Sequence, residues 1–179
     1  AEAAYSAESA GVSMEDLGAM LEGSSKLAVA GFTDVDTALS ATAKTMNAYG
    51  LTGEEAMENV QRILIQTQNK GITTVGELGA SLAQVTPTAA AFGVEFAQVG
   101  AALAGMTAQG TPTAQATTQL NSLIAELGKS GTTAANNLMK AAEGSEYAGM
   151  TFNEMMEAGA DLNDVLGMMQ ALADKSGLA

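Results

Sequence analysis

The sequence predicts an all-α fold, and three observations carry this prediction. Only 2 of the 179 residues are proline and 4% are aromatic, while alanine is abundant, which favours helix over strand. Apolar residues recur at helical spacing, without a run of alternating polar and apolar residues. A short phrase of glycine, an apolar or small residue, and a hydroxyl residue recurs along the chain. Because few side chains are large, we expect closely spaced helices and a thin core.

The recurring phrase divides the chain into similar units. Successive glycines of the phrase are 20, 19, 21, 22, 17, 21 and 18 residues apart, so the period is close to 20. The clear copies are Gly11-Val12-Ser13, Gly31-Phe32-Thr33, Gly50-Leu51-Thr52 and Gly71-Ile72-Thr73; the weaker ones are Gly110-Thr111, Gly131-Thr132 and Gly149-Met150-Thr151, with a relative that lacks the hydroxyl at Gly93-Val94-Glu95.

Each phrase is predicted to be a joint between two helices. Glycine ends the first helix in the left-handed conformation, the apolar residue forms a hydrophobic staple, and the hydroxyl caps the next helix. An acidic residue about three positions after the hydroxyl completes a capping box and suits the positive helix end. The predicted pairs are Ser13–Asp16, Thr33–Asp36, Thr52–Glu55, Thr74–Glu77 and Thr151–Glu154, while Pro87 and Pro112 are expected at the first position of their helices.

Between the joints, apolar residues fall on single helical faces. We therefore predict about nine helices of roughly 10–17 residues, packed as antiparallel neighbours in a helical bundle or a short α-solenoid. The predicted faces are Val35, Leu39, Met46 and Tyr49; Ala56, Val60, Ile63 and Leu64; Val75, Leu78, Leu82 and Val85; Phe96, Val99, Leu103 and Met106; Leu120, Leu123, Ile124 and Leu127; and Leu162, Val165, Leu166, Met169 and Leu172.

One stretch of the chain carries almost no charge. Between Glu77 and Glu126 the only charged residue is Glu95. We interpret these helices as the central core; a membrane-active hairpin is the alternative. Glycine, proline and glutamine interrupt the apolar stretches well before the ~20 residues that a membrane span needs, so no transmembrane segment is predicted.

Composition argues against several kinds of chemistry. The formal charge of −13 opposes binding to nucleic acid or to an anionic membrane. The chain has no cysteine and no histidine. The usual catalytic triads therefore lack their base or nucleophile, and soft metal sites lack their ligands. Carboxylates such as Glu15, Asp16, Asp34, Asp36, Glu54 and Glu55 sit where helix starts are expected, which capping explains. We predict no enzyme activity, and no catalytic, cofactor-binding or metal-binding residues.

Two motif-like stretches and the methionines need a separate interpretation. Gly100 to Thr107 has the glycine spacing of a phosphate loop, but Met106 stands at the lysine position. Asp161 to Asp164 hints at a calcium loop, but Leu172 replaces its last glutamate. Both are rejected. Near the C-terminal end two adjacent pairs, Met155-Met156 and Met168-Met169, either fill the core, which we favour, or line a groove for a partner.

Several blocks in one order resemble the core region of phage tail tape measure proteins of siphophages and prophages. The resemblance is good from Gly11 to Leu127 and looser over residues 128–179. The blocks are Ala28-Val29-Ala30-Gly31-Phe32-Thr33-Asp34 with Ala38; Met46-Asn47-Ala48-Tyr49-Gly50-Leu51; Glu54-Glu55-Ala56-Met57; Gly71-Ile72-Thr73-Thr74-Val75-Gly76-Glu77-Leu78; Leu82-Ala83-Gln84-Val85-Thr86-Pro87; Gly93-Val94; Leu103-Ala104; Gly110; and Ala116-Thr117-Thr118-Gln119-Leu120. Gly76 departs from the pattern, because an acidic or polar residue is commoner there.

The resemblance implies a structural role in a virion. Such a protein is made in the bacterial cytoplasm, sets tail length during assembly, fills the lumen of the tail tube and leaves ahead of the genome. Its implied partners are tail tube, tail chaperone and tail tip proteins, with self-association and host envelope contact left open. Residues 1–179 would be a single helical fragment of a longer protein, with 1–10 ending a preceding helix. The alternatives are an α-helical repeat scaffold that binds a protein partner, or a membrane-active segment.

Glycine joints encode a chain that folds back on itself, whereas a ruler must be extended. We expect the isolated fragment to be compact, with a radius of gyration of about 16 Å. As one continuous helix it would span about 270 Å. We expect the assembled tail to hold it in a more extended form.

Overall fold

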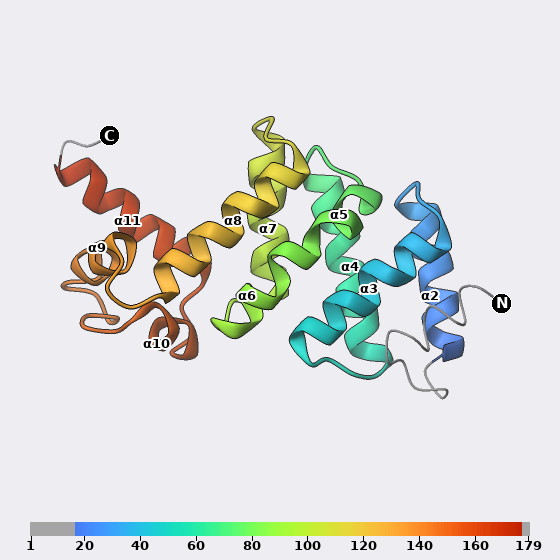
Figure 1. Ribbon diagram of the computed structural model, residues 1–179, viewed down its shortest axis with the longest axis horizontal. Coiled ribbons are helices and arrows are strands. Elements are labelled where there is room, and N and C mark those ends of the chain that lie inside the picture. The colour runs from blue at the N-terminus through green and yellow to red at the C-terminus, as the bar shows by residue number, and fades with distance from the viewer. Residues whose placement is uncertain (1–16, 177–179) are drawn as a thin grey trace.

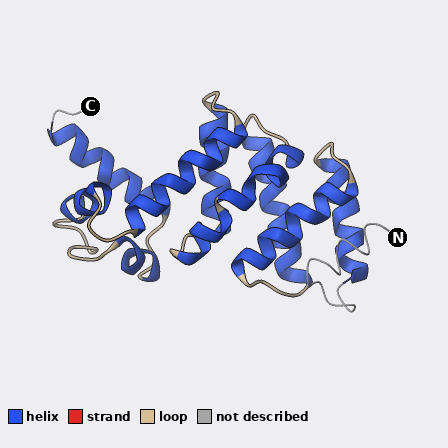
Figure 2. Cartoon of the chain, in the orientation of Figure 1, coloured by secondary structure: helices blue, strands red, loops and turns tan. Residues whose placement is uncertain are grey.

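The computed structural model describes residues 17–176, which form helices joined by short turns (Figures 1 and 2). No strand occurs within this range, which confirms the all-α prediction. The Ser13–Asp16 cap and the helix end predicted for 1–10 lie outside it. The helices are α2 (Leu17–Ala30), α3 (Val35–Tyr49), α4 (Glu54–Lys70), α5 (Val75–Ser81), the 3-10 turn η1 (Leu82–Gln84), α6 (Thr86–Ala91), α7 (Phe96–Ala108), α8 (Thr113–Gly128), α9 (Thr133–Ala141), α10 (Phe152–Glu157) and α11 (Leu162–Ser176).

The first seven helices form three stacked hairpins. Helices α2, α4 and α7 pack side by side in one layer, and α3, α5 with α6, and α8 pack in the other. The turns at Gly31, Gly71 and Gly110 lie along the upper edge of Figure 1, and those at Gly50 and Gly93 along the lower edge. The upper turns are 71 − 31 = 40 and 110 − 71 = 39 residues apart. The structural repeat is therefore a hairpin of about 40 residues, as in a short α-solenoid.

The stacking pattern changes after α8. Helix α9 packs on α8, and α11 packs on α9, while the short α10 touches α8. Beyond Val165, α11 has no fully buried side chain, and Leu166 is 36% exposed. The continuous apolar face predicted for this helix is thus buried only at its start.

The core is a thin layer of mainly aliphatic side chains, which lies between the two helix layers and continues beyond α8 to α9 and α10. Helices α7 and α8 of the low-charge stretch supply several of its members, as the sequence predicted. The largest side chains with less than 2% exposure are Phe152, Leu39, Leu64, Leu78, Leu103, Leu120, Ile124, Leu127, Leu138, Met155, Val60 and Val75.

Small residues allow α4 and α7 to approach closely. A β-carbon built on Gly100 would lie 2.7 Å from Thr67 Oγ1 and 2.8 Å from Ile63 Cγ2. A β-carbon on Gly71 would lie 3.0 Å from the Cα of Ala104. Real β-carbons do not approach other atoms this closely, so glycine sets the separation of these two helices.

Two of the predicted capping boxes are present. Thr74 Oγ1 accepts the Glu77 N–H at 3.1 Å, and Glu77 Oε2 accepts the Thr74 N–H at 3.2 Å. The same reciprocal pair joins Thr151 and Glu154. There, the Thr151 N–H and hydroxyl hold the pKa of the Glu154 carboxyl below its ordinary value.

Two other predicted caps are wrong. Helix α3 is capped by Asp34, whose Oδ1 accepts the Thr37 N–H at 2.8 Å, not by Thr33 with Asp36. This bond and the Thr37 hydroxyl lower the pKa of Asp34. Before α4 the cap residue is Gly53, with a φ of 88° and no side-chain bond, so Thr52 does not cap.

The prolines lie one residue from their predicted places. Pro87 is the second residue of α6, which begins at Thr86, and Pro112 is the N-cap residue of α8. Both remain in or next to the first turn, where a missing N–H costs nothing.

The capping geometry makes a testable prediction. Thr74→Ala should lower the free energy of unfolding by about 1 kcal/mol, because it leaves an N–H at the helix start without its acceptor. Thr52→Ala is the matched control and should change it little, since Thr52 is exposed and does not cap α4. Urea unfolding of both variants checks this, and equal losses would contradict it.

Candidate functional site: the two edges of the hairpin stack

Side chains of one hairpin bond to the turns of the next along the upper edge. Gln68 lies in the last turns of α4 and bridges two joints. Its Nε2 donates to the Ala30 carbonyl at 3.3 Å, and its Oε1 accepts the Val75 N–H at 2.8 Å. The joint after α2 and the joint after α4 are therefore tied together through one amide.

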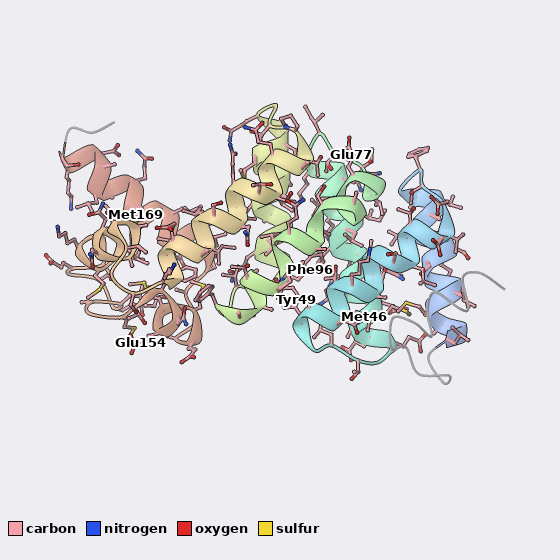
Figure 3. All side chains as sticks on the ribbon, viewed as in Figure 1. Met46, Tyr49, Glu77, Phe96, Glu154 and Met169 are labelled. Atoms are coloured by element: carbon pink, nitrogen blue, oxygen red, sulfur yellow. The ribbon has the colours of Figure 1, made fainter. Side chains whose placement is uncertain are left out.

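A second set of bonds ties the joint after α4 to the joint after α7. The Thr113 hydroxyl donates to Glu77 Oε2 at 3.1 Å, so the capping-box carboxylate also serves the neighbouring hairpin. Thr107 Oγ1 accepts the Ile72 N–H at 3.2 Å while it donates to the Leu103 carbonyl at 2.8 Å. Figure 3 labels Glu77 at this edge.

The lower edge is tied by Tyr49, the last residue of α3. Its hydroxyl donates to the Val94 carbonyl at 3.1 Å, and its ring packs on Phe96 with centroids 5.9 Å apart (Figure 3). Burial raises the pKa of the Tyr49 hydroxyl far above its ordinary value. The group therefore remains a neutral donor, and it fixes the start of α7 against α3.

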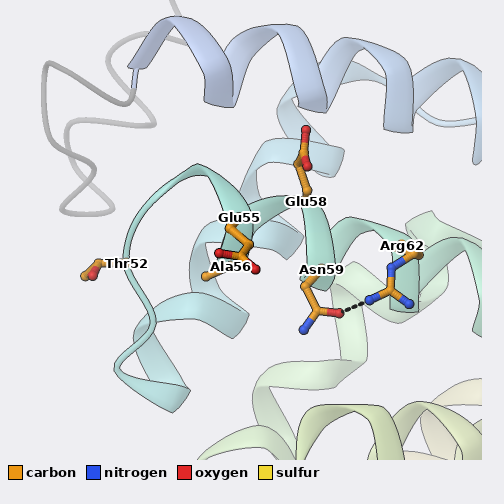
Figure 4. A pocket seen from close by; sticks show the side chains of 6 residues that line it. All are labelled: Thr52, Glu55, Ala56, Glu58, Asn59 and Arg62. Carbon is orange, nitrogen blue, oxygen red and sulfur yellow. Dashed lines mark hydrogen bonds between the residues drawn. The ribbon is translucent and has the colours of Figure 1, made fainter.

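A hollow opens on the exposed side of α4, lined by Thr52, Glu55, Ala56, Glu58, Asn59 and Arg62 (Figure 4). The Arg62 guanidinium donates to Asn59 Oδ1 at 2.5 Å. The two carboxylates are exposed and belong to the first turns of α4, where they suit the helix dipole. In the part of the chain that the structure describes, no group of three or more His, Cys, Asp or Glu side chains could hold a metal ion.

The two motif-like stretches have structural explanations. Gly100 to Thr107 lies inside α7 and makes no loop. Asp161 and Asp164 cap α11 reciprocally, since the Asp164 N–H donates to Asp161 Oδ1 at 2.9 Å and the Asp161 N–H to Asp164 Oδ2 at 3.0 Å.

The methionine pairs differ from one another. Met155 and Met156 are 0% and 7% exposed, so both fill the core although they are adjacent. Met168 and Met169 on α11 are only partly buried. The core interpretation holds for the first pair, and the second pair retains a surface that a partner could contact. Among residues 17–176, no helix is long and apolar enough to cross a bilayer.

A stack of helical hairpins, bonded from joint to joint, defines the chain as a helical-repeat protein. The sequence model of the family of phage-related minor tail proteins matches residues 1–177. The chain therefore belongs to this family of phage tail proteins. It is also 56% identical over 179 residues to a "probable tape measure protein" of Clostridium phage phiCD119, a match that covers 98% of this chain.

The chain spans about a fifth (19%) of the length of that relative. No solved structure matches the chain. The resemblance found in the sequence is confirmed at the level of the family. The scaffold and membrane alternatives are not favoured by it.

Proposed function

We propose that the protein is a segment of a tape measure, which sets the length of a phage tail during assembly and has no enzyme activity. The 56% identity to a relative with the printed name "probable tape measure protein" carries this proposal. The direct test is whether tail length follows the length of the gene.

The repeat suits a ruler. One hairpin of about 40 residues adds a constant increment of chain between equivalent joints, such as Gly31 and Gly71. An extended helix rises about 1.5 Å per residue, whereas stacked helices are only about 10 Å apart. We propose that the hairpins open in the assembled tail, because the stacked form would span only a short length of tail for each residue.

In this role the protein lies in the lumen of the tail tube and contacts tube, chaperone and tip proteins. It leaves the tail with the genome. Protease added to purified tails is expected to spare the protein until the tails are disrupted. Tails that have released DNA are expected to lack it. Cleavage in intact tails, or retention after DNA release, would contradict this location.

A further inference from the structure

The upper edge of the stack exposes three apolar side chains that lie in or beside neighbouring joints. We call Val29, Phe32 and Ile72 the apolar edge. Their side chains are 80%, 92% and 71% exposed. The joint after α2 and the joint after α4 are held together by Gln68, which bonds to both. The matching apolar residues of the lower joints turn inward, since Val94 is fully buried and Leu51 partly buried.

The exposure of Phe32 follows from a shift of one residue in its joint. At the lower joints the left-handed residue is Gly50 or Gly93, and the apolar residue that follows bonds back to the helix and packs on it. A β-carbon at Gly31 would lie 2.6 Å from Val75 Cγ2, so glycine is needed there for close packing. The left-handed position then falls on Phe32, with a φ of 51°.

The hydrogen bonds confirm this register. The Thr33 N–H donates to the Ala28 carbonyl at 3.0 Å, and the Phe32 N–H to the Val29 carbonyl at 3.5 Å. Thr33 therefore occupies the place where a staple residue would pack. The staple predicted for Phe32 is wrong for this reason, and Ile72, at 71% exposure, also forms no staple.

Phe32 thus destabilises the fold in two ways, and no contact within the fold offsets them. A residue with a β-carbon is strained in the left-handed conformation, and its ring remains in water. Strained residues that packing does not require are typical of functional positions, and exposed aromatic residues are typical anchors of interfaces.

The charges around the apolar edge decide what kind of partner fits it. The exposed carboxylates of Asp34, Asp36 and Glu77 follow Phe32 or Ile72 within five residues. The nearby lysines are Lys70 and Lys26, and Lys26 is paired with Glu22. With a net charge of −13, a second copy or an anionic membrane would meet an edge of like charge. A protein with an apolar pocket and a basic rim is complementary to it.

We propose that the apolar edge docks into a basic-rimmed apolar pocket of another phage tail protein, with Phe32 as the anchor. This rests on the proposed function of the chain in tail assembly. Three side chains cover much less than the ~800 Å² per partner of a stable interface. The contact is therefore a transient one that guides assembly.

The first test separates docking from folding. Phe32→Asn removes the ring but keeps a residue that tolerates the left-handed conformation. In the 179-residue chain, its melting temperature should stay the same or rise by about 2 °C. In the parent gene it should lower the number of complete tails at least tenfold, while their length stays normal. Met139→Ser is the control, because Met139 is 42% exposed on α9, outside the apolar edge, and tail number should not change.

Each outcome is decisive. A normal number of tails with Phe32→Asn overturns the proposal, and so does a lower melting temperature, since Phe32 would then stabilise the fold itself. Tail length that did not change with gene length would instead refute the proposed ruler. The number of tails formed with Phe32→Asn would still decide the docking proposal separately.

The second test identifies the occupant. A photoreactive benzoylphenylalanine in place of Phe32, in the full-length protein of cells that assemble tails, should cross-link to another tail protein beside lysine or arginine residues. Cross-links to a second copy, to lipid, or to no protein overturn the proposal.

Discussion

Removing residues 32–71 from the parent gene is expected to shorten the tail by about 60 Å, the length of 40 residues at about 1.5 Å each. The deletion joins Gly31 to Ile72-Thr73-Thr74, so one glycine–hydroxyl joint replaces another and α2 leads into α5. One helix of each layer, α3 and α4, is lost, and the alternation of the hairpins is kept. Electron microscopy of negatively stained samples measures the length of the complete tails, whose number is expected to fall because the deletion also removes Phe32.

The size of the change reports the form of the chain in the tail. A loss of about 10 Å would mean that the hairpins stay stacked, because this is the distance between packed helices. Duplication of the same residues is the matched control and should lengthen tails by the amount that the deletion removes. Tails of unchanged length in both variants would refute the ruler.

Gly100→Val is expected to destabilise the fold by about 3 kcal/mol, the largest effect of a single substitution here. The added β-carbon would lie 2.7 Å from Thr67 Oγ1 and 2.8 Å from Ile63 Cγ2. Both partners are β-branched and buried, at 4% and 7% exposure, so neither side chain can turn away. Helices α4 and α7 would have to move apart.

Gly105→Val provides the control on the same helix. A β-carbon at Gly105 would meet nothing within 4 Å, and valine is no worse than glycine in a helix. Urea unfolding should therefore show little loss for Gly105→Val and a large loss for Gly100→Val. Equal losses would mean that helix propensity, and not the contact between α4 and α7, accounts for the effect.

The fold class could be predicted because its signals are local. Helical spacing of apolar residues and capping boxes such as Thr74–Glu77 need only neighbouring residues. The failed prediction of a staple at Phe32 depends on a partner distant in sequence. The joints at Gly31 and Gly50 look alike, yet Val75 crowds the first and leaves the second open.

The cross-hairpin bonds could not be predicted for the same reason. Gln68 and Ala30 are 38 residues apart, and Tyr49 and Val94 are 45 apart. A glutamine or tyrosine on a helix has many partners within reach, and only the stacking register selects one. The exposed Phe32 was missed because its apolar character matched the other joints, while its backbone register did not.

The stack of hairpins has a mechanical consequence. Within the three stacked hairpins, α4 contacts α2 and α7 in its layer, and α3 and α8 lie on either side of α5 and α6. Most helix packing joins adjacent hairpins, and Tyr49 of α3 adds a contact with Phe96 of α7, one hairpin further on. Tension on the chain is therefore expected to load mainly one boundary at a time. We therefore expect the stack to open in steps of about 40 residues, one hairpin at a time, when its two ends are pulled apart. It needs no force large enough to break the whole fold at once.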